Sequence, residues 1–217
     1  MDLKRTLETL RDRHMAQIDD FARDALEDEL ARLRMLRIAE EALGFGDHLP
    51  DFRLYDGFGT AWSSGALLDR GPLVLAFFRG GWCPYCAPIM TALDRSAPAL
   101  RALGASVAGI VPDVGDAVRH SASERGLTYP LLIDPANAYA ELCGLVYELS
   151  PDHVQLHRDR KRDLAAMHGE RRWRLPIPAV YVIDRKGDVV FAFTDVDPAN
   201  WPDPEALIAT LDRLAAP

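Results

Sequence analysis

The sequence predicts an α/β protein whose central sheet is mainly parallel. Two observations lead to this fold class. From residue 46 to residue 149, short apolar runs typical of buried strands alternate with longer runs typical of helices. A polar and basic segment over residues 150–175 interrupts this alternation, and two further apolar runs and a helical run follow it. Strands that alternate with helices form βαβ units, so most of the sheet is expected to be parallel.

Length, composition and charge exclude several classes of protein. The chain has 217 residues, the size of one domain or of one domain with an appendage. Hydrophobic residues make up 48% and charged residues 27%, which excludes a mostly disordered chain and a disulfide-dense scaffold. The net charge of −8 argues against a nucleic-acid partner. No run approaches the ~18 apolar residues of a membrane span, and the charged N-terminus lacks the apolar centre of a secretory signal.

The first element is an N-terminal helical extension over residues 1–44, placed before a domain over residues 45–217. From residue 2 to about residue 44, leucines and other apolar residues recur at helical spacing, and no proline occurs before Pro50. Gly44 and Gly46 supply a stop. The apolar stripe of this helix needs a partner, either its own domain or a second copy of the chain. The second alternative predicts a homodimer.

The elements of the second domain follow in order from the local patterns. Apolar runs that predict strands occupy residues 51–55, 60–63, 72–78, 105–111, 129–133, 179–184 and 188–193. Runs compatible with helices occupy residues 83–103, 113–125 and 204–214. The last two strands flank a turn over residues 185–187 and are expected to form a hairpin. The polar segment over 150–175 is expected to be a helical insertion before this hairpin.

The predicted chemistry lies in Phe-Phe-Arg-Gly-Gly-Trp-Cys-Pro-Tyr-Cys, residues 77–86. A buried strand ends there, the Gly80-Gly81 turn follows, and Cys83-Pro84-Tyr85-Cys86 opens a helix. Free N–H groups at a helix start favour a thiolate, which is the nucleophilic form of cysteine. Proline suits the first helical turn, and a cysteine three positions on lies one turn away, where it can close a disulfide. The pattern indicates thiol–disulfide chemistry, and the lack of a secretory signal places it in a reducing cytoplasm.

The alternative for the two cysteines is half of a zinc site. A tetrahedral zinc site needs four ligands, commonly two such pairs or one pair with two histidines. This chain offers one pair, a distant Cys143, and His153 and His157 inside the polar segment. We therefore expect no metal.

A second landmark is Leu175-Pro-Ile-Pro178, which directly precedes a predicted strand. A proline is allowed where a strand starts, and the bond before a proline is where a cis peptide can occur. Together with the strand, Cys-x-x-Cys and helix unit, this arrangement predicts a cis peptide bond at Pro178.

These stretches resemble the thioredoxin superfamily, and within it the Cys-x-x-Cys type of the peroxiredoxin-like branch of the alkyl hydroperoxide reductase / thiol-specific antioxidant family. Residues 46–54 are similar to the family's opening G-x-x-x-P-D-F-x-L strand. Residues 79–86 resemble its active-site loop, and residues 176–187, with Val196-Asp-Pro198 nearby, its late hairpin. The resemblance covers residues 42 to 214. It implies a thioredoxin-like fold with a central mixed sheet flanked by helices.

The resemblance also implies an enzyme that reduces hydroperoxides or exchanges disulfides, without a bound cofactor. Typical members carry P-x-x-x-T-x-x-C, ending in the peroxidatic cysteine. When the final Cys of this pattern is aligned without gaps to Cys86, the Thr position falls on Cys83 and the Pro position on Arg79. When it is aligned to Cys83, the Thr position falls on Gly80. The family's late arginine corresponds to Pro178. A substitute cation can come from Arg79, or from Arg172 or Arg174 upstream.

Two enzymatic mechanisms fit these residues. In the first, a thiolate attacks a hydroperoxide, becomes a sulfenic acid, and forms a disulfide with the other cysteine, which a thioredoxin-type donor or a small thiol then reduces. In the second, the thiolate attacks a disulfide. In both, we expect Cys83 to attack and Cys86 to resolve, with Trp82 shielding one side of the site and Tyr85 shaping the turn. A redox-sensing interaction module is the alternative outside enzymes.

The remaining candidates carry less specific signals. Cys143 ends a short helical run and is expected to pack in the core, with an intersubunit thiol as the alternative. Residues 157–174 hold seven Lys or Arg and three Asp or Glu, which indicates a solvated helical face, or else a docking patch for an acidic reductase or an anionic substrate. The histidines at 14, 48, 120 and 168 form no recognisable constellation.

Overall fold

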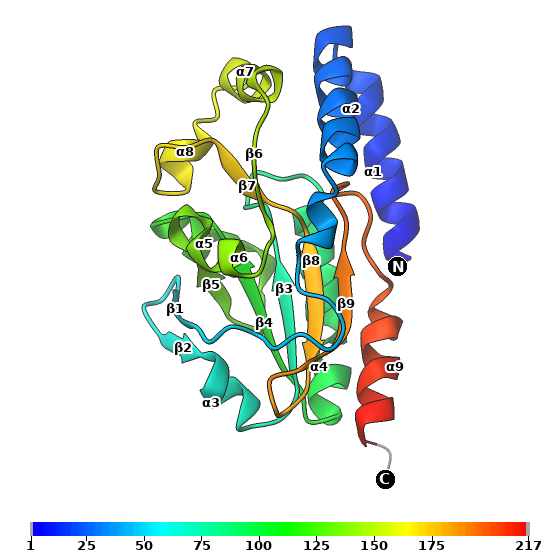
Figure 1. The fold of residues 1–217 in the computed structure, drawn as a ribbon, viewed down its shortest axis with the longest axis vertical. Coiled ribbons are helices and arrows are strands. Elements are labelled where there is room, and N and C mark those ends of the chain that lie inside the picture. Colours follow the sequence, from blue (N-terminus) through cyan, green and yellow to red (C-terminus); the bar gives the residue numbers. More distant parts are fainter. Residues whose placement is uncertain (1, 216–217) are drawn as a thin grey trace.

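The protein is built around a seven-stranded mixed sheet in the order β2-β1-β5-β4-β3-β8-β9 (Figure 1). The computed structural model describes residues 2–215. The strands of this sheet are β1 (Arg53–Asp56), β2 (Ala61–Ser63), β3 (Leu73–Phe77), β4 (Ser106–Val111), β5 (Leu131–Ile133), β8 (Ala179–Ile183) and β9 (Val189–Thr194). β3, β4 and β5 are parallel, while β1, β2 and the β8–β9 hairpin run antiparallel. The predicted α/β class with a mixed sheet is confirmed.

Helices cover both faces of this sheet. They are α1 (Leu3–Gln17), α2 (Asp20–Met35), α3 (Ser64–Leu68), α4 (Cys86–Ala102), α5 (Asp116–Arg125), α6 (Ala138–Leu142), α7 (Pro151–Asp159), α8 (Leu164–Met167) and α9 (Pro204–Ala215). α7 and α8 lie in the segment before the late hairpin, where the sequence predicts helices. That segment is framed by a separate antiparallel pair, β6 (Val146–Glu148) and β7 (Arg174–Pro176).

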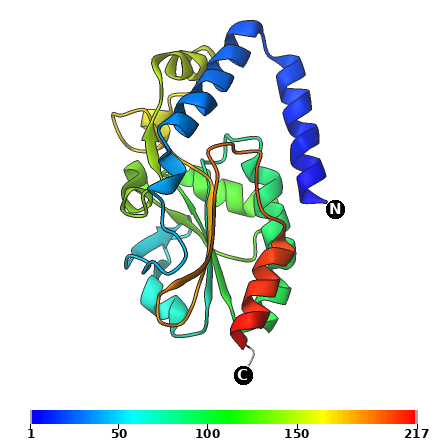
Figure 2. The same ribbon diagram turned by 45° about the vertical axis from the view of Figure 1, so that its right-hand side comes forward.

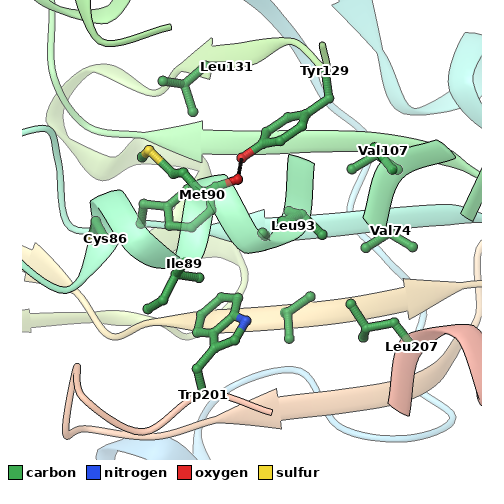
Figure 3. Close-up of a cluster of buried hydrophobic side chains, with 14 of the residues drawn as sticks. Val74, Cys86, Ile89, Met90, Leu93, Val107, Tyr129, Leu131, Trp201 and Leu207 are labelled. Atoms are coloured by element: carbon green, nitrogen blue, oxygen red, sulfur yellow. Dashed lines mark hydrogen bonds between the residues drawn. The ribbon is translucent and has the colours of Figure 1, made fainter. Parts of the chain in front are cut away.

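The core has two layers because successive strand residues point to opposite faces. On one face, Val74 and Ala76 pack with the buried residues of α4 and α9, including Ile89, Met90 and Leu207 (Figure 3). Tyr129 closes this layer by donating its hydroxyl to the carbonyl of Met90 at 3.2 Å. On the other face, the alternate residues of β3 pack against α6 and the β6–β7 pair. The strand that leads to the cysteine loop is therefore buried along its whole length.

The N-terminal helical run is broken, unlike the single helix that the periodicity predicts. Ile18 has an extended backbone, and the Asp19 side chain accepts a hydrogen bond from the N–H of Ala22 at 2.8 Å, which caps α2. The two helices then diverge, as Figure 2 shows. Leu3 and Leu7 of α1 join the core layer of α4, whereas Leu33 of α2 joins the opposite layer. An aspartate cap thus turns one amphipathic run into two arms that reach opposite faces of the sheet.

The prediction of a cis peptide bond at Pro178 is wrong. No cis peptide bond occurs within residues 2–215. Two hydrogen bonds hold the chain between β7 and β8: Ile177 donates its N–H to the carbonyl of Leu145 at 2.8 Å, and the carbonyl of Pro178 accepts from Asp195 at 3.3 Å. The bond before Pro178 is trans in this arrangement, the form with an intrinsic advantage of about 0.5–1 kcal/mol.

The structure also bears on the membrane question. None of the helices between residues 2 and 215 has both the length and the apolarity that crossing a bilayer requires.

Candidate active site

The two cysteines lie where β3 gives way to α4. Cys83 occupies the loop and donates its N–H to the carbonyl of Gly80 at 3.2 Å, and Cys86 donates its N–H to the carbonyl of Cys83 at 3.2 Å. α4 begins at Cys86, three residues after the predicted helix start. The thiol of Cys83 therefore stands ahead of the helix, where the N–H groups of Tyr85 and Cys86 point at its sulfur. This is the position in which helix N–H groups stabilise a thiolate.

Both thiols are free and buried, yet their acidities diverge. Burial raises the pKa of Cys83, but a hydrogen bond from the Cys86 thiol, the charge of Arg79 and two backbone N–H groups outweigh burial and lower that pKa below the ordinary thiol value. Burial raises the pKa of Cys86 well above that value, and its hydrogen bond to Cys83 raises it further. The pair is therefore asymmetric: Cys83 carries the negative charge and Cys86 keeps its proton.

Arg79 is the cation next to the cysteines. It is 7% exposed, and its Nη2 donates to the hydroxyl of Tyr147 at 3.3 Å. Its guanidinium lies 5.2 Å from the ring centroid of Trp82, and its Nε has no hydrogen-bond partner within residues 2–215. Burial lowers the pKa of Arg79, but Tyr147 and the two cysteines raise it, with a net rise. A buried cation without a carboxylate partner is costly unless an anion, here the Cys83 thiolate, lies nearby.

Asp113 accepts a hydrogen bond from the Gly80-Gly81 turn. Gly81 donates its N–H to Oδ2 of Asp113 at 2.7 Å. Gly80 has a φ of +124°, and a Cβ there would lie 2.9 Å from both Oδ1 of Asp113 and Nε1 of Trp82, so glycine is required. Burial raises the pKa of Asp113 to about 6, opposed by the Gly81 hydrogen bond. No motif marks Asp113, although its place just after β4, the parallel neighbour of β3, is a signal that could have found it.

Replacing Asp113 by asparagine is expected to make stability less dependent on pH. The folded-state pKa of about 6 lies above the ordinary aspartate value of 3.8, so the protonated carboxyl favours the fold below pH 3.8 and this contribution is lost as pH rises through about 6. Asparagine stays neutral and keeps an acceptor for Gly81. In urea unfolding, the advantage of Asp113→Asn over wild type should grow by on the order of 2 kcal/mol between pH 4 and pH 7. The exposed Asp24→Asn is the control, and a pH-independent advantage would show that Asp113 ionises normally.

A cavity of about 300 Å³ opens in front of Cys83. Its walls come from α1, α2, the cysteine loop, α7 and residues 196–198. Cys83 lines the cavity, together with Arg79 and Trp82 of the loop, whereas Cys86 is covered by the core. Side chains of the two N-terminal helices, among them Met15 and Leu30, supply an apolar wall. Only one of the two sulfurs therefore faces a space that a substrate can enter.

Two buried histidines of α7 reach this cavity. The ring of His157 packs edge-on against Trp82 with centroids 4.9 Å apart, and it stacks on His153 at 5.2 Å. His153 Nδ1 lies 3.6 Å from Oε1 of Glu29 on α2. Burial lowers the pKa of His157 to about 2, and the nearby His153 and arginines add to this effect, so His157 is neutral. Neither of its ring nitrogens has a partner among the described residues.

The other sequence candidates lie elsewhere or play supporting parts. Cys143 ends α6 inside the opposite core layer, and burial raises its pKa to about 12. Arg174 pairs with Glu141 and Glu170, and Arg172 lies 3.7 Å from Glu148; neither lines the cavity. Of the three arginines considered as substitute cations, the structure brings only Arg79 to Cys83. Within the described chain, no group of three or more His, Cys, Asp or Glu side chains is placed to hold a metal ion.

Comparison with known proteins places this chain in a family. The model of the AhpC/TSA family matches residues 45–192. Comparison with curated protein sequences finds no match.

Solved structures of peroxiredoxins share the fold. The peroxidoxin BcpB from Mycobacterium tuberculosis is 24% identical with a TM-score of 0.64, covering 79% of this chain and 98% of its own. The bacterioferritin comigratory protein of Xanthomonas campestris is 19% identical with a TM-score of 0.59, covering 76% and 92%. A variant of PrxQ from Xylella fastidiosa is 17% identical with a TM-score of 0.62, covering 80% and 98%. At these identities the structures establish the thioredoxin-like fold alone.

The family model spans more than half of the chain, and it includes the cysteine loop, β3, α4 and most of the late hairpin. The chain belongs to the AhpC/TSA family and is a peroxiredoxin-like thiol oxidoreductase.

Proposed function

We propose that the protein is a thiol peroxidase that reduces organic hydroperoxides through Cys83 and Cys86. The observation that carries this proposal is the asymmetry of the pair: the sulfur with the lowered pKa is the one that faces the cavity and Arg79. An alkyl peroxide reduction activity is described for the Xanthomonas campestris bacterioferritin comigratory protein, which shares the fold. The proposal assigns the same class of reaction to this chain.

The proposed reaction uses the two sulfurs in turn. The Cys83 thiolate attacks the terminal oxygen of the hydroperoxide, the S–O bond forms, the O–O bond breaks, and the alkoxide leaves and takes up a proton. The Cys86 thiol then condenses with the Cys83 sulfenic acid, which forms the disulfide and releases water. The two thiols have lost two electrons, which a thioredoxin-type donor or a small thiol in a reducing cytoplasm returns.

Arg79 supports both charges of the first step. Its guanidinium stabilises the attacking thiolate, and because it lines the same cavity as Cys83 it is available to stabilise the negative charge that develops on the leaving oxygen. The opposite assignment, with Cys86 as the attacking residue, requires a thiol with a raised pKa that does not line the cavity.

A single-turnover experiment tests the proposed function. Reduced protein is mixed with hydrogen peroxide or cumene hydroperoxide, and oxidation is followed by Trp fluorescence and intact mass. We expect oxidation at least about 100-fold faster than for the same chain unfolded in urea, because a placed cation and a formed site contribute at least that much. The Cys143→Ser variant is the control and should match wild type. Oxidation at the rate of the unfolded chain would reject the peroxidase and leave disulfide exchange or redox sensing.

We also propose that the chain forms a homodimer through its N-terminal helices. Phe21, Met35 and Leu36, in α2 or at its end, remain largely exposed in the single chain, although apolar side chains of this size are favoured inside. Sedimentation velocity at micromolar concentration should show a dimer. A monomer throughout that range would contradict the proposal.

A further inference from the structure

The cavity in front of Cys83 carries unpaired positive charge in a protein whose net charge is −8. Five arginines and three acids line it: Arg11 pairs with Asp197 at 2.8 Å, Arg34 lies 4.0 Å from the same carboxylate, and the exposed Glu27 forms no ion pair within the described chain. The buried Glu29 is held by Arg32 at 2.9 Å. The other three cavity arginines, at 79, 160 and 162, form no ion pair within the described chain.

The turn after α7 places two of these arginines. Lys161 adopts a left-handed conformation with a φ of +55°, and Arg162 donates its N–H to the carbonyl of His157 at 2.9 Å. As a result Arg160 and Arg162 line the cavity, whereas Lys161 between them does not. The Arg162 guanidinium lies 5.5 Å from the ring centroid of Trp82, the same ring that Arg79 contacts.

Arg160 and Arg162 line the same cavity, and neither forms an ion pair within the described residues. Burial lowers the pKa of Arg162, and the charge of Arg160 lowers it further, while the Cys83 thiolate raises it. Two like charges that line one cavity without a carboxylate partner are unfavourable, and a bound carboxylate relieves the repulsion. His157 adds a second sign of a missing ligand, because it is 2% exposed and both of its ring nitrogens are unpartnered within residues 2–215.

The rest of the cavity suits an organic molecule better than hydrogen peroxide. Its volume of about 300 Å³ is roughly ten times the share of one water molecule in the liquid, ~30 Å³. Leu26 and Leu30 of α2, with Met15 of α1, add an apolar lining to the same cavity. The cavity therefore offers a reacting sulfur, an apolar wall and a cationic region.

We propose that Arg160, Arg162 and His157 form a subsite for the carboxylate of an organic hydroperoxide, so that the enzyme prefers carboxylate-bearing hydroperoxides over neutral ones of the same size. Guanidinium groups bind carboxylates through charge-assisted, often bidentate hydrogen bonds. Arg79 acts at the other end of the substrate, where the peroxide reacts with Cys83. This inference rests on the proposed function, since it names the substrate class of the same site.

The test compares two hydroperoxides that differ in one group: cumene hydroperoxide and cumene hydroperoxide bearing a para-carboxylate. The second-order rate constant for Cys83 oxidation is measured with each, by Trp fluorescence and intact mass. The readout is the ratio of the two rate constants. For wild type we expect a preference for the carboxylate of about tenfold or more, equivalent to about 1.4 kcal/mol, which is within reach of one charge-assisted hydrogen bond.

Variants assign the preference to the subsite. The double variant Arg160→Gln with Arg162→Gln should bring the ratio to about one. Lys161→Gln removes one positive charge between these positions but outside the cavity lining, and it should keep the wild-type ratio. The wild-type preference should also shrink in high salt, because salt screens partly exposed charges. Because the ratio is taken within each variant, a general loss of activity does not imitate the result.

The outcomes distinguish failure of the carboxylate subsite from failure of the proposed peroxidase function. A wild-type ratio near one, with both reactions fast, would overturn the carboxylate subsite and leave the peroxidase intact. A preference that survives the double variant would overturn the assignment to Arg160 and Arg162. Reaction with both hydroperoxides at the rate of the unfolded chain would reject the proposed function itself.

Discussion

Replacing Cys83 by serine is expected to abolish rapid oxidation by hydroperoxides. Cys83 is the sulfur with the lowered pKa and the one that lines the cavity, so the remaining Cys86, with its raised pKa, cannot take over the attack. A nucleophile acting with its partners as a unit supplies most of the rate, so the loss should be on the order of 10⁴-fold or more. Stopped-flow Trp fluorescence with cumene hydroperoxide measures this loss directly.

Replacing Cys86 by serine should have a different effect. The Cys83 thiolate still attacks once, but no thiol is present to condense with the sulfenic acid. Intact mass should therefore show one added oxygen in Cys86→Ser, whereas wild type should show the loss of two hydrogens on disulfide formation. Trapped sulfenic acid in Cys83→Ser and not in Cys86→Ser would reverse the two roles.

Removing the charge of Arg79 is expected to give the second-largest loss. Arg79→Met keeps a long side chain but withdraws a cation that lowers the pKa of Cys83. The pKa of Cys83 should then rise, and the pH profile of its alkylation by iodoacetamide should move to higher pH by about 1–3 pH units. Oxidation by hydroperoxide at pH 7 should fall about 10²–10³-fold, as for the loss of one electrostatic donor at a reacting oxygen.

Two further variants separate charge from packing at Arg79. Arg79→Lys restores a cation and should recover part of both the rate and the pH profile, while the exposed Arg70→Met should change neither. Because Arg79 forms no ion pair within residues 2–215, its removal leaves no orphaned carboxylate; it does remove the hydrogen bond to the buried Tyr147 hydroxyl, so the free energy of unfolding should fall by about 1 kcal/mol only. An unchanged pH profile in Arg79→Met would show that the helix N–H groups alone set the acidity of Cys83.

The sheet and the cysteine loop could be predicted because their signals are local. Buried strands such as β3 appear as unbroken apolar runs, and the Gly80-Gly81 turn follows directly from the next residues. The sequence predicts the start of α4 three residues too early, because a proline such as Pro84 also fits the turn that precedes a helix. The break at Ile18 leaves no trace in the periodicity, because Asp19 starts a new helix as an N-cap and neither a proline nor a glycine marks the end of the first.

The other parts of the site could not be predicted because they depend on long-range contacts. Gly81 and Asp113 are 32 positions apart, and Arg79 and Tyr147 are 68 apart. The sequence suggests His157 only as a zinc ligand. Its ring contacts Trp82 because the folded insertion lies against the cysteine loop. The prediction of a cis bond at Pro178 failed for a related reason: the hydrogen-bond partners of that segment, Leu145 and Asp195, lie far from it in the chain.

The divergence of α1 and α2 has a consequence for the step in which an electron donor reduces the Cys83–Cys86 disulfide. With one helix anchored on each face of the sheet, the two arms and α7 wall in the cavity over Cys83, which is only 2% exposed. A small thiol fits a space of about 300 Å³, but the folded surface of a protein donor does not. In this conformation the two arms thus select electron donors by size: the cavity at Cys83 admits small thiols, and the arms cover Cys83 against a protein surface.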